Sequence, residues 1–444
     1  MDAVTTRIDR LPVTAFHRKL LVVAGVGWMF DAMDVGLVSF VVAALVKEWQ
    51  LQPLQAGFIS SAGFAGMFVG AALAGLLADR FGRKAMFQAT MAMYSVATGL
   101  CALAGGLGTM LGLRFLVGLG LGGELPVAST LVSEFSPARR RGTMIVVLES
   151  FWAYGWVLAA LIGYLVIPVY GWRVAFLLGA LPALYLLVLR RGIPESPRFL
   201  LSQGRADEAE DVVRLIGVED VPAPRLVSSA ADRASLRWVE RVAQLWRPPY
   251  LRRTVMLWVL WFGIVYSYYG VFTWLPSLLS AELSSLTRSF QYVLIITLAQ
   301  IPGYFSAAYL VERVGRKWTL VSYLLACAVG AFVFRNATSA TDVLFWGSVI
   351  SFFNLGAWGV VYTYTPELYP TRIRGTGAGW AAAFGRIGGI IGPYVVGLLL
   401  PSWQTTKEGI FAMFAAVFLV IAVVVSALGE ETKGGSLEQI APET

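Results

Sequence analysis

The chain alternates between long apolar stretches and short polar ones. A helix needs about 20 residues to cross the hydrocarbon core of a bilayer, and twelve apolar stretches have about that length, in two groups of six. The first group spans 20–46, 54–78, 85–104, 108–131, 143–167 and 172–190, and the second spans 252–280, 288–311, 317–334, 341–364, 374–400 and 408–428. This pattern predicts an all-α membrane protein with twelve transmembrane helices.

The segment between the two groups is polar and charged. It holds two short amphipathic helix candidates, 205–216 and 234–245, joined by a stretch that contains Pro222 and Pro224. Helices of this kind lie on a membrane surface or against the helix bundle. We therefore divide the chain into an N-terminal six-helix bundle (1–190), a cytoplasmic linker (191–251) and a C-terminal six-helix bundle with a cytoplasmic tail (252–444).

Composition and charge agree with a protein solvated by lipid. Hydrophobic residues make up 57% of the chain and charged residues 14%, whereas soluble domains have about 25% charged residues. The net charge of +8 belongs in cytoplasmic loops, since no basic soluble domain is visible that could bind nucleic acid. Eleven Lys and Arg residues fall in one set of short loops and five in the other, which places both termini in the cytoplasm.

Little in the sequence supports catalysis or metal binding. Cys101 and Cys327 lie in apolar stretches, and His17 is the single histidine. These residues supply no metal-ligand spacing and no nucleophile–base set, so we expect no cofactor and no enzyme activity. The first apolar stretch is too long for a cleavable signal and has acids inside it.

The chain contains an internal repeat. Segment 75–84 (GLLADRFGRK) recurs at 308–317 (AYLVERVGRK), and segment 134–143 (EFSPARRRGT) recurs at 367–376 (ELYPTRIRGT). Asp79 and Glu312 are 233 residues apart, and so are Glu134 and Glu367. Two motifs with one spacing indicate a duplicated six-helix unit.

Acids and bases recur together in these motifs at the predicted cytoplasmic face. They could form a charged lock across the two halves that opens with the cytoplasmic gate. The alternative is that they are loop anchors that follow the positive-inside rule. The gate candidates are Asp79, Arg80, Arg83, Glu134, Arg141, Glu195, Arg198, Glu312, Arg316, Glu367 and Arg374.

The motif at 75–84 resembles the signature of the major facilitator superfamily. The Glu-x6-Arg-Gly pattern from Glu134, its copy from Glu367, and Pro-Glu-Ser-Pro-Arg at 194–198 resemble the sugar-porter and organic-ion-carrier branches. Within them, 27–36 (GWMFDAMDVG) is most similar to the bacterial niacin (nicotinate) transporters. The resemblance implies two pseudo-symmetric bundles around a midplane site, alternating access and a place in the bacterial inner membrane. We expect a monomer.

Ionisable residues inside membrane spans cost about 2.5–3.5 kcal/mol each, so each is a candidate functional residue. Asp31 and Asp34 share one face of the first span, and Arg114 lies at a similar depth in the fourth. Resemblance to proton-coupled sugar porters implies a proton switch made of Arg114 and a first-span acid, which we match to Asp31. The alternative is a static ion pair. Glu124 and Glu149 could serve in gating or in a second protonation, and the sequence does not decide.

Arg386, in the eleventh predicted span, points to the substrate. The surrounding stretch resembles the organic-ion carriers, in which carriers of anions have Arg at this position and carriers of cations Asp. A guanidinium in a cavity binds a carboxylate through two charge-assisted hydrogen bonds, or it balances the buried acids. Candidates to surround an aromatic ring are Tyr266, Tyr269, Phe353, Asn354 and Trp358.

The sequence therefore predicts an importer of a small aromatic carboxylate, nicotinate above all, together with protons. The alternatives are a carrier of another aromatic acid, of a sugar or of an organic cation, and a non-transporting sensor on the same fold.

Overall fold

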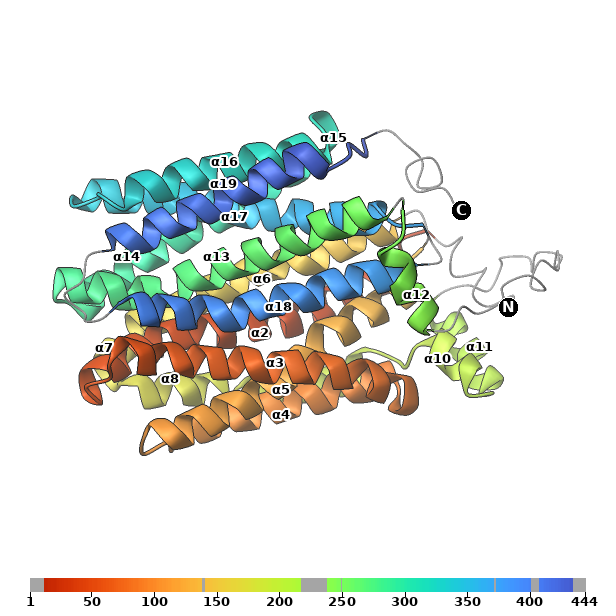
Figure 1. Ribbon diagram of the computed structural model, residues 1–444. Helices are drawn as coiled ribbons and strands as arrows, with labels where there is room; N and C mark the ends of the chain where they lie inside the picture. The colour runs from red at the N-terminus through yellow and green to blue at the C-terminus, as the bar shows by residue number, and fades with distance from the viewer. Residues whose placement is uncertain are drawn as a thin grey trace.

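The computed structural model describes residues 12–137, 140–216, 238–248, 250–370, 373–400 and 407–433. Within these residues every regular element is a helix, and the long helices run side by side in one bundle (Figure 1). Nine helical stretches in this part of the chain are long and apolar enough to cross a membrane. The other three predicted spans correspond to α4, α5 and the pair α8–α9. The predicted all-α membrane fold is confirmed.

The N-terminal half follows the predicted spans closely, with one interruption. The sixth span is broken near Pro182, which begins α9 because its nitrogen has no hydrogen to donate to the preceding turn. The helices are α2 (Ala15–Glu48), α3 (Pro53–Phe81), α4 (Arg83–Cys101), α5 (Leu107–Phe135), α6 (Arg141–Leu165), α7 (Ile167–Tyr170), α8 (Trp172–Gly179) and α9 (Pro182–Gly192).

The C-terminal half has a similar break in its second span. Pro302 cannot donate a hydrogen bond to the carbonyl of Leu298, and the helix divides between these two residues. The helices are α13 (Leu251–Leu283), α14 (Leu286–Leu298), α15 (Gln300–Arg313), α16 (Arg316–Phe334), α17 (Ala340–Glu367), α18 (Arg374–Leu399) and α19 (Glu408–Leu428).

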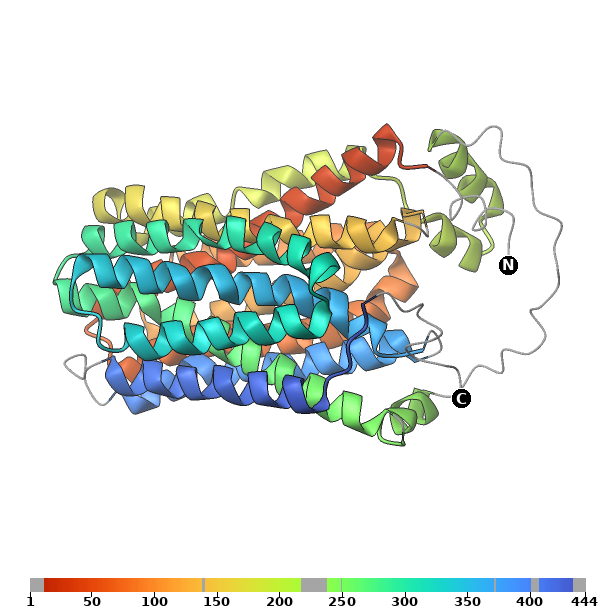
Figure 2. The same ribbon diagram turned by 90° about the horizontal axis from the view of Figure 1, so that it is seen from above.

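Three short helices of the linker lie beyond one end of the bundle (Figures 1 and 2). They are α10 (Pro197–Ser202), α11 (Ala206–Leu215) and α12 (Trp238–Leu245). The helix predicted at 205–216 is α11, and the described part of the one predicted at 234–245 is α12. The helix α10 was not predicted. The repeated motifs lie at this end, which we call the motif end; we call the opposite end the far end.

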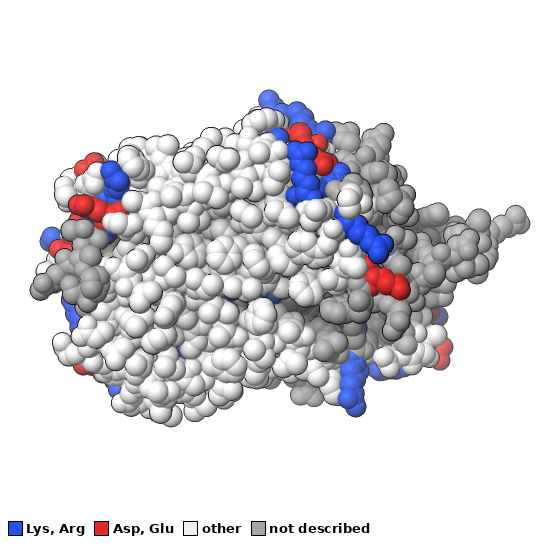
Figure 3. Space-filling model, in the orientation of Figure 1, with Lys and Arg blue, Asp and Glu red and all other residues white. Residues whose placement is uncertain are grey.

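The surface of the bundle is divided into zones. Figure 3 shows charged side chains at the two ends and a broad uncharged band between them. Large apolar side chains such as Leu184, Phe305 and Val423 are more than half exposed. Soluble proteins rarely expose contiguous apolar surface of this extent, so the band is the surface that faces lipid and the protein spans the membrane several times.

The two halves meet closely near the far end, where α3 packs against α18. A Cβ atom placed on Gly57 would lie 2.8 Å from the carbonyl oxygen of Pro393, so only glycine fits there. The Ser61 hydroxyl donates to the carbonyl of Ile390 at 2.8 Å. These contacts hold α3 and α18 together at the far end.

Candidate functional site

A cavity of about 820 Å³, its opening included, lies between the two halves. Both halves contribute to its wall. The N-terminal half supplies Trp28, Phe64, Met67, Glu149 and Trp152, and the C-terminal half supplies Trp261, Val265, Tyr268, Tyr269, Tyr304, Leu355, Trp358, Tyr362, Ala382, Arg386 and Gly389.

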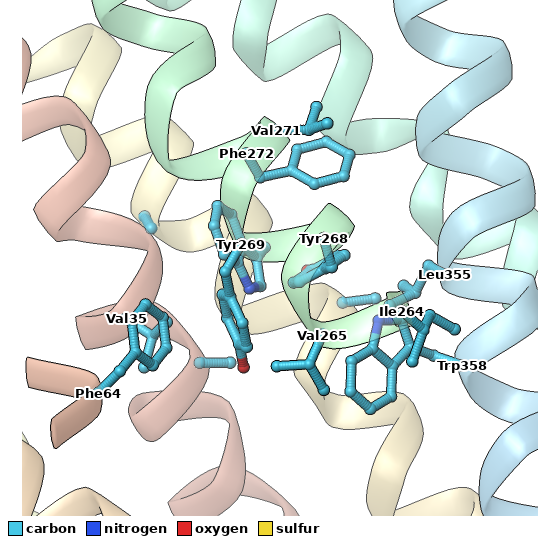
Figure 4. Packing of buried hydrophobic residues seen from close by; sticks show 14 of the residues in the cluster. Val35, Phe64, Ile264, Val265, Tyr268, Tyr269, Val271, Phe272, Leu355 and Trp358 are labelled. Atoms are coloured by element: carbon cyan, nitrogen blue, oxygen red, sulfur yellow. The ribbon is translucent and has the colours of Figure 1, made fainter. Parts of the chain in front are cut away.

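Aromatic rings form most of the wall. Figure 4 shows Tyr269 with Phe64 on one side and Tyr268 and Trp358 on the other, and the centroids of the Phe64 and Tyr269 rings are 4.3 Å apart. The Trp152 indole donates to the Tyr268 hydroxyl at 3.2 Å, which links α6 to α13 across the cavity. Rings packed in this way offer faces and edges on which a flat ligand can stack.

The wall also contains one basic and one acidic side chain, from opposite halves. Arg386 comes from α18, and Glu149, which is 4% exposed, comes from α6. Among the described residues neither side chain forms an ion pair. Tyr269 and Tyr362 each interact electrostatically with both Arg386 and Glu149, so both side chains lie near these two rings. The cavity therefore presents a guanidinium and a carboxyl group, neither of them in an ion pair among the described residues, to whatever it binds.

Glycines bring α18 close enough to place Arg386 in the cavity. A Cβ atom on Gly388 would lie 2.5 Å from the carbonyl oxygen of Phe262 on α13, and one on Gly385 would lie 3.1 Å from that of Trp261. Such close backbone approach requires small residues at the helix interface.

Two of the five side chains predicted to surround the substrate ring lie in the cavity wall with Arg386. These two are Tyr269 and Trp358. Tyr266 was predicted to surround the ring but does not line the cavity. It lies about 100° around α13 from Val265, which faces the cavity. Its hydroxyl instead donates to the Met413 sulfur.

The two predicted contacts on α17 do not line the cavity either. The cavity face of this helix carries Leu355, Trp358 and Tyr362. Phe353 lies about 200° around the helix from Leu355 and packs against other rings. Asn354 is completely buried and is absent from the wall.

Several wall residues were not singled out from the sequence. Spacing could have found some of them, since Trp152 follows Glu149 by three residues and Tyr362 follows Trp358 by four, which puts each pair on one helix face. The missed residues are Trp28, Phe64, Met67, Trp152, Trp261, Val265, Tyr268, Tyr304, Leu355, Tyr362, Ala382 and Gly389.

A second group of charges lies inside the N-terminal half, outside the cavity wall. Both terminal nitrogens of Arg114 donate to one oxygen of Asp34, at 3.1 and 3.2 Å, and Thr98 donates to the other at 2.7 Å. Arg114 therefore reaches Asp34, as the sequence predicted, and the two residues form a buried ion pair.

The other two acids of this group have no basic partner among the described residues. Asp31 is 1% exposed, and the groups that interact with it are the Tyr94 hydroxyl and the carboxylates of Glu124 and Asp34. Glu124 is also buried and accepts from Thr90 at 2.7 Å. Of the first-span acids, it is Asp34 and not Asp31 that the Arg114 guanidinium holds.

The charged motifs pair within each half. The Arg83 guanidinium lies 3.4 Å from Glu134, which joins α4 to α5, and Arg316 lies 3.1 Å from Glu367, which joins α16 to α17. Glu312 lies 3.4 Å from Arg316. The sequence allowed either a charged lock across the two halves or loop anchors, and the described pairs connect neighbouring helices of one half. They follow the repeat, so each half carries its own copy.

The remaining gate candidates are less informative. Arg80 is exposed, and the Arg374 guanidinium donates to the carbonyl of Tyr369. The side chains of Asp79, Arg141 and Arg198 lie outside the part of the chain that the structure describes.

Each half also has a glutamate that accepts hydrogen bonds from the start of a helix at the motif end. The copy in the C-terminal tail was not predicted. Glu195 accepts hydrogen bonds from the backbone nitrogens of Arg83 and Lys84, at 3.1 and 3.2 Å, where α4 begins. Glu431 accepts from the backbone nitrogen of Arg316 at 2.9 Å, where α16 begins. Each carboxylate satisfies free N–H groups at a helix N-terminus and tethers the segment after its half to the motif end.

Comparison with known proteins agrees with this architecture. The family model described as "Sugar (and other) transporter" matches residues 29–443. The chain belongs to this family. It is 51% identical over 440 residues to the niacin transporter NiaP of Acinetobacter baylyi, covering 99% of this chain and 100% of that protein. It is 49% identical over 422 residues to a putative niacin/nicotinamide transporter NiaP of Bacillus subtilis, covering 95% and 98%.

Solved structures show the same fold. The partially occluded, inward-open xylose transporter XylE from E. coli matches with a TM-score of 0.76 at 20% identity, over 95% of this chain and 100% of that one. The fold is therefore that of the major facilitator superfamily. The protein is a membrane transporter and not an enzyme.

Proposed function

We propose that this protein imports nicotinate across the inner membrane of a bacterium by alternating access, together with protons. The observation that carries the proposal is Arg386, a guanidinium without an ion pair among the described residues, in a cavity walled by aromatic rings. A guanidinium binds a carboxylate through two parallel charge-assisted hydrogen bonds. The rings around it suit the flat face of a pyridine.

The relatives support the choice of substrate. Two proteins are about half identical to this chain along nearly its whole length; one is named a niacin transporter and the other a putative niacin/nicotinamide transporter. Arg386 favours the acid form of the vitamin over its amide, because only the acid brings a charge that balances the guanidinium.

The orientation and the conformational cycle are part of the proposal. The excess of Lys and Arg in the motif-end loops supports a cytoplasmic location for that end. The contacts of Gly57 and Ser61 with α18 would then close the far end toward the outside, so this conformation would be the one that releases substrate inward. The carrier would act as a monomer with nicotinate, protons and lipid as its partners.

Uptake of radiolabelled nicotinate into proteoliposomes tests the proposal. We expect saturable uptake that an inward proton gradient increases, and that unlabelled nicotinate inhibits. An Arg288→Ala carrier should behave as wild type, because Arg288 is exposed at the far end. Absence of saturable uptake by folded wild-type protein would overturn the assignment to nicotinate.

A further inference from the structure

The acid in the cavity, Glu149, has no role in binding a carboxylate. Arg386 already offers the charge that an anionic substrate needs, and a second carboxylate in the same cavity would repel that substrate. Charges inside a membrane protein that lack an ion pair are costly and mark function. Glu149 therefore needs a partner on the ligand, and this partner must be basic or must bring a proton.

Nicotinate has such a group. It is a flat ring with a carboxylate at one side and a basic ring nitrogen toward the other. The nitrogen has one lone pair, and an ionised carboxylate has only acceptor atoms, so the two groups repel each other unless a proton lies between them. With one proton present, either the Glu149 hydroxyl donates to the nitrogen or a pyridinium N–H donates to the carboxylate.

On the basis of the function proposed above, we propose that Glu149 binds the ring nitrogen of the substrate through the transported proton, while Arg386 binds its carboxylate. The proton comes from solution when nicotinate enters and returns to solution when nicotinate leaves. The occupied site then contains one guanidinium, two carboxylates and one added proton, and its net charge is zero. No covalent bond forms or breaks other than the bond to this proton.

The placement of the two charges explains how proton and substrate travel together. Glu149 lies on α6 of the N-terminal half and Arg386 on α18 of the C-terminal half, and Tyr269 and Tyr362 interact with both. A ligand that satisfies both charges connects the two halves across the cavity. Without the proton, Glu149 and the ring nitrogen repel each other, and the halves lose that connection. Substrate and proton therefore favour the same occluded state.

Other charged and titratable groups lie on the helices that face Glu149 across the cavity or pack against α6. Across the cavity they are Arg386 on α18, Tyr268 and Tyr269 on α13, Tyr304 on α15 and Tyr362 on α17. On helices packed against α6, they are Asp31 and Asp34 on α2, Arg114 and Glu124 on α5, and Arg288 and Tyr292 on α14. Asp34 is held by Arg114, and Arg288 is exposed at the far end.

Binding to the purified full-length protein tests the proposal. Affinity for nicotinate and for benzoate, which has the carboxylate but no ring nitrogen, is measured by calorimetry over a series of pH values, with wild type, Glu149→Gln and the control Glu408→Gln. Wild type should lose affinity for nicotinate up to about tenfold per unit rise in pH, as binding linked to one proton requires. It should bind benzoate at least about tenfold more weakly.

The glutamine amide of the Glu149→Gln variant can donate to the nitrogen without taking up a proton, so this variant should bind nicotinate with little dependence on pH. Glu408→Gln should match wild type, because Glu408 is exposed at the start of α19. Equal affinity of wild type for the two acids, or an unchanged pH dependence in Glu149→Gln, would overturn the proposal.

Two further measurements keep the proposal testable if Glu149→Gln fails to fold. Wild type alone should still discriminate nicotinate from benzoate. At a pH high enough for Glu149 to be ionised in the free protein, it should also take up one proton from solution per bound nicotinate, which a pH-indicating dye detects. Binding of nicotinate at every pH without proton uptake, and with an affinity that does not fall as pH rises, would overturn the role of Glu149. Failure of wild type to bind nicotinate would instead overturn the proposed function.

Discussion

Arg114 on α5 donates through both terminal nitrogens to one oxygen of Asp34 on α2, whereas Asp31, one turn earlier on α2, has no ion pair among the described residues. This difference separates two acids that look equivalent in the sequence. Asp34 is fixed by a buried pair and by Thr98, which suits a residue that holds α2, α4 and α5 together. Asp31 is held by no base, which suits a residue that gains and loses a proton.

Neutralising Asp34 should harm the fold more than neutralising Asp31. Asp34→Asn leaves the Arg114 guanidinium buried without its counter-charge, and loss of one member of a buried pair typically costs about 3–5 kcal/mol. We expect a clearly lower melting temperature in detergent. Asp31→Asn should melt like wild type and still exchange nicotinate, but should accumulate less of it under a pH gradient, because one group that gains and loses a proton is missing while Glu149 remains. Undiminished accumulation by Asp31→Asn would remove this residue from proton coupling.

Removal of the cavity guanidinium should abolish uptake of the anion. Arg386→Ala takes away the group that balances the substrate carboxylate, and truncating one member of a desolvated charge pair costs about 2–5 kcal/mol, or roughly 30-fold to several thousand-fold in affinity. Initial uptake rates in proteoliposomes measure the loss, with Arg288→Ala as the matched control. Normal uptake by Arg386→Ala would place the carboxylate elsewhere.

The aromatic wall should contribute to affinity only where it faces the cavity. Trp358→Ala removes a ring from the wall, and one good ring contact contributes about 0.5–1.5 kcal/mol beyond the area it buries. We expect the KM for nicotinate to rise about twofold to tenfold. Tyr266→Phe should leave KM unchanged, because its hydroxyl contacts Met413 outside the cavity. Equal effects of the two variants on KM would contradict the placement of Trp358 in the cavity wall and of Tyr266 outside it.

These residues show how far the sequence leads. The helices follow from apolar length, and the repeat follows from two motifs with equal spacing. The cavity face of a helix does not follow from either, because it depends on the tilt of that helix and on what the other half brings opposite it. Tyr266 and Tyr268 are both aromatic and two residues apart, yet only Tyr268 lines the cavity. Glu431 escaped prediction because it lies 236 residues after Glu195, three positions off the repeat.

The paired charges at the motif end should matter for transport more than for folding. Glu134→Gln removes the carboxylate 3.4 Å from Arg83, and Glu367→Gln removes its counterpart beside Arg316. These side chains keep 13–17% of their exposure at the end of the bundle, so losing one partner should cost less stability than in a fully buried pair such as Arg114–Asp34. We therefore expect normal amounts of folded protein in the membrane with reduced initial uptake. Parallel loss of protein and uptake would favour a role in anchoring the loops.

Adding one methyl group at Gly57 should open the far end. The new Cβ would lie 2.8 Å from the backbone oxygen of Pro393, which cannot rotate away as a side chain could, so α3 and α18 must separate. The equilibrium should shift toward a state in which the far end is open. Labelling of a Ser61→Cys reporter by a membrane-impermeant thiol reagent measures this shift. Cys101 and Cys327 are both buried, and both can be replaced by alanine in the background.

Labelling should be faster with Gly57→Ala than without it. Gly379→Ala on α18 is the matched control, because a Cβ there meets nothing within 4 Å and alanine is the better helix former by about 1 kcal/mol. The Ser61→Cys reporter could instead label at the same rate with Gly57→Ala as with Gly379→Ala. In that case α3 and α18 do not separate during the cycle. Closure of the far end must then depend on other contacts, such as that between Phe40 on α2 and Phe290 on α14.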